Sequence, residues 1–185
     1  SELYLHELEL YKKHDKCYQA RQLYLLRTRQ MRDQPLSLQE MLCLLTMHIF
    51  AHHKHPKDPT QATKLFQSFL AADQRNTLGT EGFNAILQVW ASSSHDSRCD
   101  EHLRLHFSQM DSSLSETPGK CVPDSKSYEW MVIGLKNIKD AEIFYTQALE
   151  AGMSTPSLHE KFLKRLMNEG EGEKAMELYA KLKQT

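Results

Sequence analysis

Hydrophobic positions recur along this chain at the spacing of an α-helix, and no stretch alternates apolar and polar residues as a half-buried β-strand would. Together with the turn residues, this periodicity predicts five antiparallel helical hairpins, so we expect an all-α fold. The predicted hairpins span residues 2–32, 37–72, 80–112, 125–151 and 156–184. An exposed loop rich in serine, proline and glycine is expected at 112–123. Gly152 and Gly170 are expected to end two of the helices, because glycine readily adopts the left-handed backbone of a helix cap.

A short sequence phrase occurs once in each predicted hairpin: a small residue, two spacers, an apolar residue and then an aromatic one. The copies are Ala20–Tyr24, Ala62–Phe66, Ala141–Tyr145 and Ala175–Tyr179, with a degenerate copy at Leu103–Phe107. Residues i and i+4 share one face of a helix, so each phrase sets a small residue one turn from a ring. Intervals of 42, 41, 38 and 34 residues between copies predict a stacked repeat array, an α-solenoid. We expect each ring, including that of Tyr179, to be part of the core.

The carboxyl-terminal hundred residues resemble pentatricopeptide repeats. Gly82–Leu87 is similar to the family's opening of a first helix, and Pro123–Tyr128 is similar to its junction between one motif and the next. Further phrases that fit the family motif are Leu103–Met110, Ile133–Leu135, Asp140–Tyr145 and Glu150–Met153. Tetratricopeptide repeats are the second choice, since the Pro-Asp junction and the Gly-Met turn favour the pentatricopeptide form.

The resemblance implies a superhelix of paired helices that serves mitochondrial or plastid RNA metabolism. It also implies three candidate base-reading residues: Asn84 paired with Asp124, and Glu129 at the next reading position. An amide can bond a base edge, and a carboxylate can orient that amide. Glu129 does not fit the usual code, because its charge would repel phosphate. The alternative is that these polar side chains only solvate a concave face.

Charge is nearly balanced, at −1 for 185 residues with 25% charged residues, which argues against a dominant polybasic surface. The best basic patch lies near the amino terminus and provides candidate contacts to RNA phosphates. Its members are Lys12, Lys13, Lys16, Arg27, Arg29 and Arg32. The alternative is an ordinary solvated helix face.

Histidine pairs at helical i, i+4 spacing, His48 with His52 and His102 with His106, are the other chemical feature of the chain. Neither pair has the glutamate of a zinc protease motif or a paired cysteine, so we expect no metal. No phosphate-binding loop or nucleophile motif is present, so we expect no catalysis, no cofactor and no small-molecule substrate. No apolar run is long enough to cross a bilayer.

These observations predict a non-catalytic helical-repeat binding protein of mitochondrial gene expression. It would associate with single-stranded RNA or a ribonucleoprotein in transcript processing, stability or translation, or as an accessory subunit of the mitochondrial ribosome. The alternative is a protein–protein interaction scaffold of tetratricopeptide type that grips a partner helix or peptide without RNA. The near-neutral charge favours the alternative, and the family resemblance favours the first function.

Overall fold

The computed structural model describes residues 6–10, 19, 22, 23, 26, 59–72, 79–112 and 121–183. All regular secondary structure in these residues is α-helical, so the prediction of an all-α fold is confirmed for them. Much of the two hairpins predicted at 2–32 and 37–72 lies outside the described residues.

The helices from residue 60 onward are α4 Thr60–Ala72, α5 Gly79–Ala91, α6 Cys99–Ser112, α7 Ser125–Gly134, α8 Ile138–Glu150, α9 Pro156–Asn168 and α10 Gly172–Leu182. From residue 72 onward, the ends of the predicted hairpins lie within two residues of the ends of these helices. Side chains of Asp124, Asn137 and Thr155 accept backbone N–H bonds at the starts of α7, α8 and α9. Gly152 and Gly170 end α8 and α9 with φ of 70° and 82°, as predicted.

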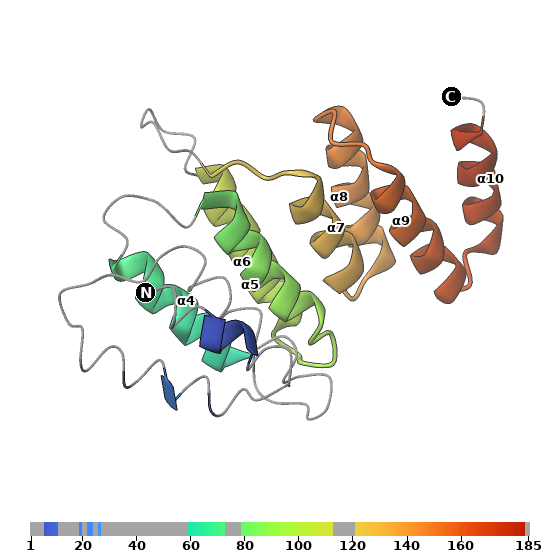
Figure 1. Ribbon diagram of the computed structural model, residues 1–185. Helices are drawn as coiled ribbons and strands as arrows, with labels where there is room; N and C mark the ends of the chain where they lie inside the picture. The colour runs from blue at the N-terminus through green and yellow to red at the C-terminus, as the bar shows by residue number, and fades with distance from the viewer. Residues whose placement is uncertain are drawn as a thin grey trace.

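The helices pack in pairs and between pairs. α5 lies against α6, α7 against α8, and α9 against α10, while α5 also packs on α7 and α7 on α9. Figure 1 shows the described helices following one another across the molecule in chain order, from α4 to α10. We call α5, α7 and α9 the first helices of their pairs, and α4, α6, α8 and α10 the second helices.

The repeated phrase lies at the contact between a second helix and the next first helix. The small or apolar residue that opens each described copy is buried, and Phe66, Phe107 and Tyr145 are buried as predicted. The prediction for Tyr179 is wrong, because 46% of its surface is exposed. The reason is that no helix of the described chain follows α10 to cover this ring.

The end of the predicted exposed loop is partly buried. Residues 113–120 lie outside the described part of the chain, but Cys121 and Pro123 are buried. The Thr80 hydroxyl donates to the Val122 carbonyl at 3.0 Å, which ties this segment to the start of α5. The expectation of full exposure is therefore wrong for Cys121 and Pro123.

Gly134 allows α7 to approach the preceding helix pair closely. A Cβ at this position would lie 2.7 Å from the Ala91 Cα and 2.6 Å from the Leu103 Cδ1. Because the Ala91 contact is with backbone, the helices would have to move apart. We expect Gly134→Ala to lower the free energy of unfolding by about 1–3 kcal/mol, measured by urea denaturation followed by circular dichroism.

Gly172→Ala is the matched control, because a Cβ there meets nothing within 4 Å. Alanine in that first helical turn should leave the free energy of unfolding unchanged or raise it by up to about 1 kcal/mol. Equal stability of Gly134→Ala and Gly172→Ala would contradict the close approach of α7 to α5 and α6.

Candidate functional site

Polar side chains bridge neighbouring first helices at two places, and the first of these bridges joins α5 to the start of α7. The Asn84 Nδ2 donates to the Asp124 Oδ1 at 3.0 Å, and the Ser127 hydroxyl donates to the Asn84 Oδ1 at 2.7 Å. Asp124 is also the N-cap of α7, where it accepts the Ser127 backbone N–H at 2.9 Å. The structure thus brings together two of the residues that the sequence proposed as a base-reading pair.

A second bridge links α7 to the start of α9 in the same way. Glu129 lies five residues after the N-cap Asp124, and it accepts a bond from the hydroxyl of the next N-cap, Thr155, at 3.4 Å. Lys161 forms an ion pair with Glu129 and places its ammonium 5.3 Å from the centre of the Trp130 ring. The third base-reading candidate is therefore a helix-to-helix contact as well.

Both bridges are largely hidden from solvent. Asn84 is 8% exposed and Glu129 is 7% exposed. Each bond of these side chains joins one first helix to the next, so their first role is to fix the register of neighbouring pairs. The second amide hydrogen of Asn84 and the Oδ2 of Asp124 take no part in these bonds.

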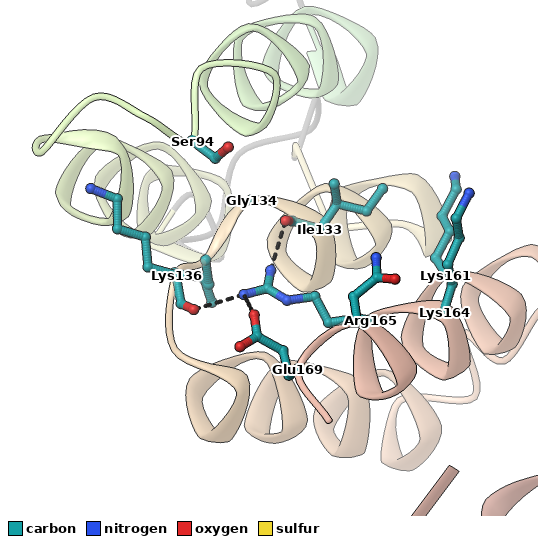
Figure 2. Close-up of a pocket in the computed structure, with 10 residues that line it drawn as sticks. Ser94, Ile133, Gly134, Lys136, Lys161, Lys164, Arg165 and Glu169 are labelled. Atoms are coloured by element: carbon teal, nitrogen blue, oxygen red, sulfur yellow. Dashed lines mark hydrogen bonds and ion pairs between the residues drawn. The ribbon is translucent and has the colours of Figure 1, made fainter. Parts of the chain in front are cut away.

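An open cavity of about 610 Å³ lies on the same helices, towards the carboxyl ends of α7 and α9. Its charged lining is mainly basic, with four cationic side chains and one carboxylate. The lining residues are Ser94, Ile133, Gly134, Leu135, Lys136, Lys161, Lys164, Arg165, Asn168 and Glu169. Figure 2 shows Arg165 in the middle of this lining, between the α7 carbonyls and Glu169.

Two of the four cations hold the surrounding helices together. Arg165 donates to the carbonyls of Val132, Ile133 and Lys136 at 3.2, 2.7 and 2.7 Å. The carbonyls of Val132 and Ile133 lie in the last turn of α7, where the helix has no internal donors left for them, and that of Lys136 lies just beyond the helix. The Lys136 ammonium donates to the Asp96 carbonyl at 2.8 Å in the turn between α5 and α6.

The other two cations lie near the rim of the cavity. Lys161 and Lys164 are three residues apart on α9 and extend in the same direction (Figure 2). Lys161 is paired with Glu129, whereas Lys164 is exposed and has no ion pair in the described chain. This edge of α9 therefore has a net positive charge that an anionic ligand can reach.

The histidine pair on α6 packs against aromatic rings of the core. The His102 ring stacks on the Trp90 indole with centroids 3.9 Å apart, and His106 is 1% exposed against Phe66. Within the described residues, no three His, Cys, Asp or Glu side chains are grouped in a way that could hold a metal ion. His48 and His52 lie outside the described part of the chain.

The described cysteines are buried thiols. Burial raises the pKa of Cys99 to about 11, and it also raises the pKa of Cys121. A thiol with such a pKa remains protonated near neutral pH and is a poor nucleophile. The Cys99 Sγ instead donates to the Trp90 carbonyl at 3.1 Å.

The candidate phosphate contacts from the amino-terminal patch cannot be placed relative to this face. Lys12, Lys13, Lys16, Arg27, Arg29 and Arg32 all lie outside the described residues. The cations of the cavity were not predicted from the sequence. Three of them are close together in the sequence, as Lys161-x-x-Lys164-Arg165, and this cluster was the available signal for a basic site. Lys136 lies near them only because α7 packs on α9.

No family model and no curated protein matches the chain. Among the described helices, none combines the length and the apolar character needed to cross a membrane.

Proposed function

We propose that this chain is a non-catalytic helical-repeat protein that binds single-stranded RNA along the face formed by α5, α7 and α9. In this proposal the helical hairpins stack as an α-solenoid. The repeated bridge supports the stacking, because on α5 and on α7 the polar residue that follows an aromatic ring, Asn84 or Glu129, contacts the N-cap of the next first helix. The resemblance to pentatricopeptide repeats supports a role in mitochondrial gene expression, in transcript processing, stability or translation, or as an accessory subunit of the mitochondrial ribosome.

The observation that carries the proposal is the basic cavity next to the Glu129–Lys161 bridge. Lys161 belongs to both features, since it pairs with Glu129 and lines the cavity. In the proposed complex, the phosphates of an RNA strand contact Lys161 and Lys164. The same strand then passes beside Asn84 and Asp124. Phosphate contacts of this kind supply affinity and position, and base contacts add preference.

The RNA proposal predicts a steep dependence of affinity on salt. Binding of a labelled, unstructured oligouridine should weaken as salt rises, with a log–log slope of about −0.7 for each phosphate neutralised. Lys164→Gln should weaken binding at low salt and make the slope shallower by about 0.7, because one cationic contact is lost. Fluorescence anisotropy across a salt series measures both quantities.

Lys139→Gln is the matched control, since Lys139 is exposed on α8, away from the cavity lining. It should leave affinity and slope unchanged. Absence of binding at low salt, or a slope that Lys164→Gln does not change, would contradict the proposal.

That negative result would favour the second function, a protein–protein interaction scaffold. A specific observation supports this alternative: Asn84 and Glu129 are nearly buried and already bonded to neighbouring helices. The net charge of −1 is also low for a protein that holds RNA mainly by charge.

A further inference from the structure

Each described second helix except α10 packs an aromatic ring on a ring of the next first helix. The three pairs are Phe66–Phe83, Phe107–Tyr128 and Tyr145–Phe162, with ring centroids 5.0, 5.2 and 4.2 Å apart. In each pair the second-helix ring belongs to the repeated sequence phrase. A ring of the repeated phrase therefore packs on a ring of the next first helix three times, although Phe162 lies one turn later in α9 than Tyr128 does in α7.

The α10 helix carries the phrase but has no such occupant. Ala175 is 3% exposed, as in the earlier copies, while Tyr179 is 46% exposed. Met167 of α9 and Met176 of α10 are also exposed, by 59% and 66%. Three large apolar side chains thus reach solvent from the last described helix pair. We call Glu160, Met167, Met176 and Tyr179 the terminal face.

Glu160 on the terminal face holds the position that Glu129 has in the second bridge. Glu160 lies five residues after the N-cap Thr155, the position that Glu129 holds after Asp124. Glu129 pairs with Lys161 of the next first helix, six residues after that helix's N-cap. Glu160 is exposed and has no ion pair in the described chain.

We propose that the terminal face binds an amphipathic helix of a partner protein, which packs on it as α9 packs on α7 and α8. The chemistry of that helix follows from the occupants already present. It carries a polar N-cap and an aromatic or imidazole ring four residues later, as Tyr128 follows Asp124 and His159 follows Thr155. A basic residue six residues after the N-cap pairs with Glu160. A ring at the position of Phe162 packs on Tyr179.

A second copy of this chain does not supply such a helix from its described residues. The helices α5, α7 and α9 each have their ring-bearing side packed on the preceding pair. Leu8, in the described part of the amino-terminal segment, is fully buried in the core. The described helices of a second copy are therefore not available to occupy the terminal face.

The probe is a synthetic peptide of residues 154–169, the sequence of the occupant that α8 already holds. A lactam between the peptide's Glu160 and Lys164 side chains, both exposed in α9, would hold it helical, because short free helices are marginal in water. The peptide is labelled, and its binding to the whole 185-residue chain is measured by fluorescence anisotropy.

We expect saturable binding that weakens at least about tenfold in the protein variant Tyr179→Ala, since a central ring dominates such contacts. The peptide variant Phe162→Ala should lose binding to a similar extent. Ile143→Ala is the matched protein control, because Ile143 is also exposed, by 53%, but lies on α8 outside the terminal face. Its affinity should equal that of the unmodified chain.

A charge exchange tests the polar contact. The protein variant Glu160→Lys should weaken binding, and the peptide variant Lys161→Glu should restore it. Three results would overturn the proposal: no binding of the peptide, binding that Tyr179→Ala leaves unchanged, or self-association of the chain that Tyr179→Ala abolishes. The last result would identify a second copy as the occupant.

Discussion

Trp90→Ala should lower the free energy of unfolding by about 3–5 kcal/mol. Trp90 is fully buried, and its indole N–H donates to the Thr63 hydroxyl at 3.0 Å. Its ring also stacks on His102, so it joins α4, α5 and α6 at one point. Truncation removes these contacts and leaves a large void between three helices. Urea denaturation followed by circular dichroism measures the loss.

Two variants separate the causes of this loss. Trp90→Phe keeps an aromatic ring but removes the N–H donor, so its cost should be clearly smaller than that of Trp90→Ala. Trp130→Ala, at a half-buried ring beside Lys161, should also cost less. A Trp90→Ala loss below about 1 kcal/mol would contradict the placement of this ring at the junction of α4, α5 and α6.

The sequence predicted the described helices well because their signals are local. Proline or a capping side chain at a helix start, glycine at a helix end, and helical spacing of apolar residues all act within a few residues. Thr155 and Pro156 start α9, for example, and Gly170 ends it. Such signals give the bounds of a helix and the side that it buries.

The same local signals could not predict the environment of Tyr179. The phrase Ala175–Tyr179 is equivalent to Ala141–Tyr145, yet Tyr145 is 4% exposed and Tyr179 is 46% exposed. Burial of the ring depends on the first helix that follows, and the phrase carries no information about that neighbour. The prediction that Tyr179 is buried therefore failed because burial depends on a neighbouring helix, and not because the ring was placed on the wrong side of α10.

The candidate site was likewise predicted only in part from the sequence. The resemblance placed Asn84 and Asp124 together across 40 residues, and the 3.0 Å hydrogen bond confirms that they are neighbours. It did not predict that Asn84 and Glu129 would be largely buried and bonded to neighbouring helices. The cavity needs Lys136 from the end of α7 beside Lys161 and Lys164 from α9, a grouping that only the packing of the two helices produces.

We expect His106 to make the fold sensitive to acid. It is 1% exposed, its Nδ1 is bonded to Gln109 at 3.1 Å, and its buried Nε2 has no hydrogen-bond partner among the described groups. Burial is the main cause that lowers the pKa of His106 from 6.5 to about 4, and the charge of nearby His102 lowers it further. The folded state therefore favours the neutral imidazole.

This shift predicts that stability falls as the pH drops below about 6.5. In that range the unfolded chain takes up a proton at His106 and the folded chain does not, which favours unfolding. The loss should reach about 2 kcal/mol at pH 5 and roughly 3 kcal/mol below pH 4, where the folded imidazole is protonated as well. Urea denaturation from pH 7 to pH 4 measures this dependence.

His106→Phe should remove this part of the pH dependence, because it keeps a ring against Phe66 but cannot take up a proton. The difference in free energy of unfolding between His106→Phe and the unmodified chain should therefore grow by about 2 kcal/mol from pH 7 to pH 5. His95→Gln serves as the control, since His95 is exposed in the turn between α5 and α6, and this variant should parallel the unmodified chain. Parallel pH profiles for His106→Phe and the unmodified chain would show that His106 is solvated enough to titrate normally, and would contradict its burial between α4 and α6.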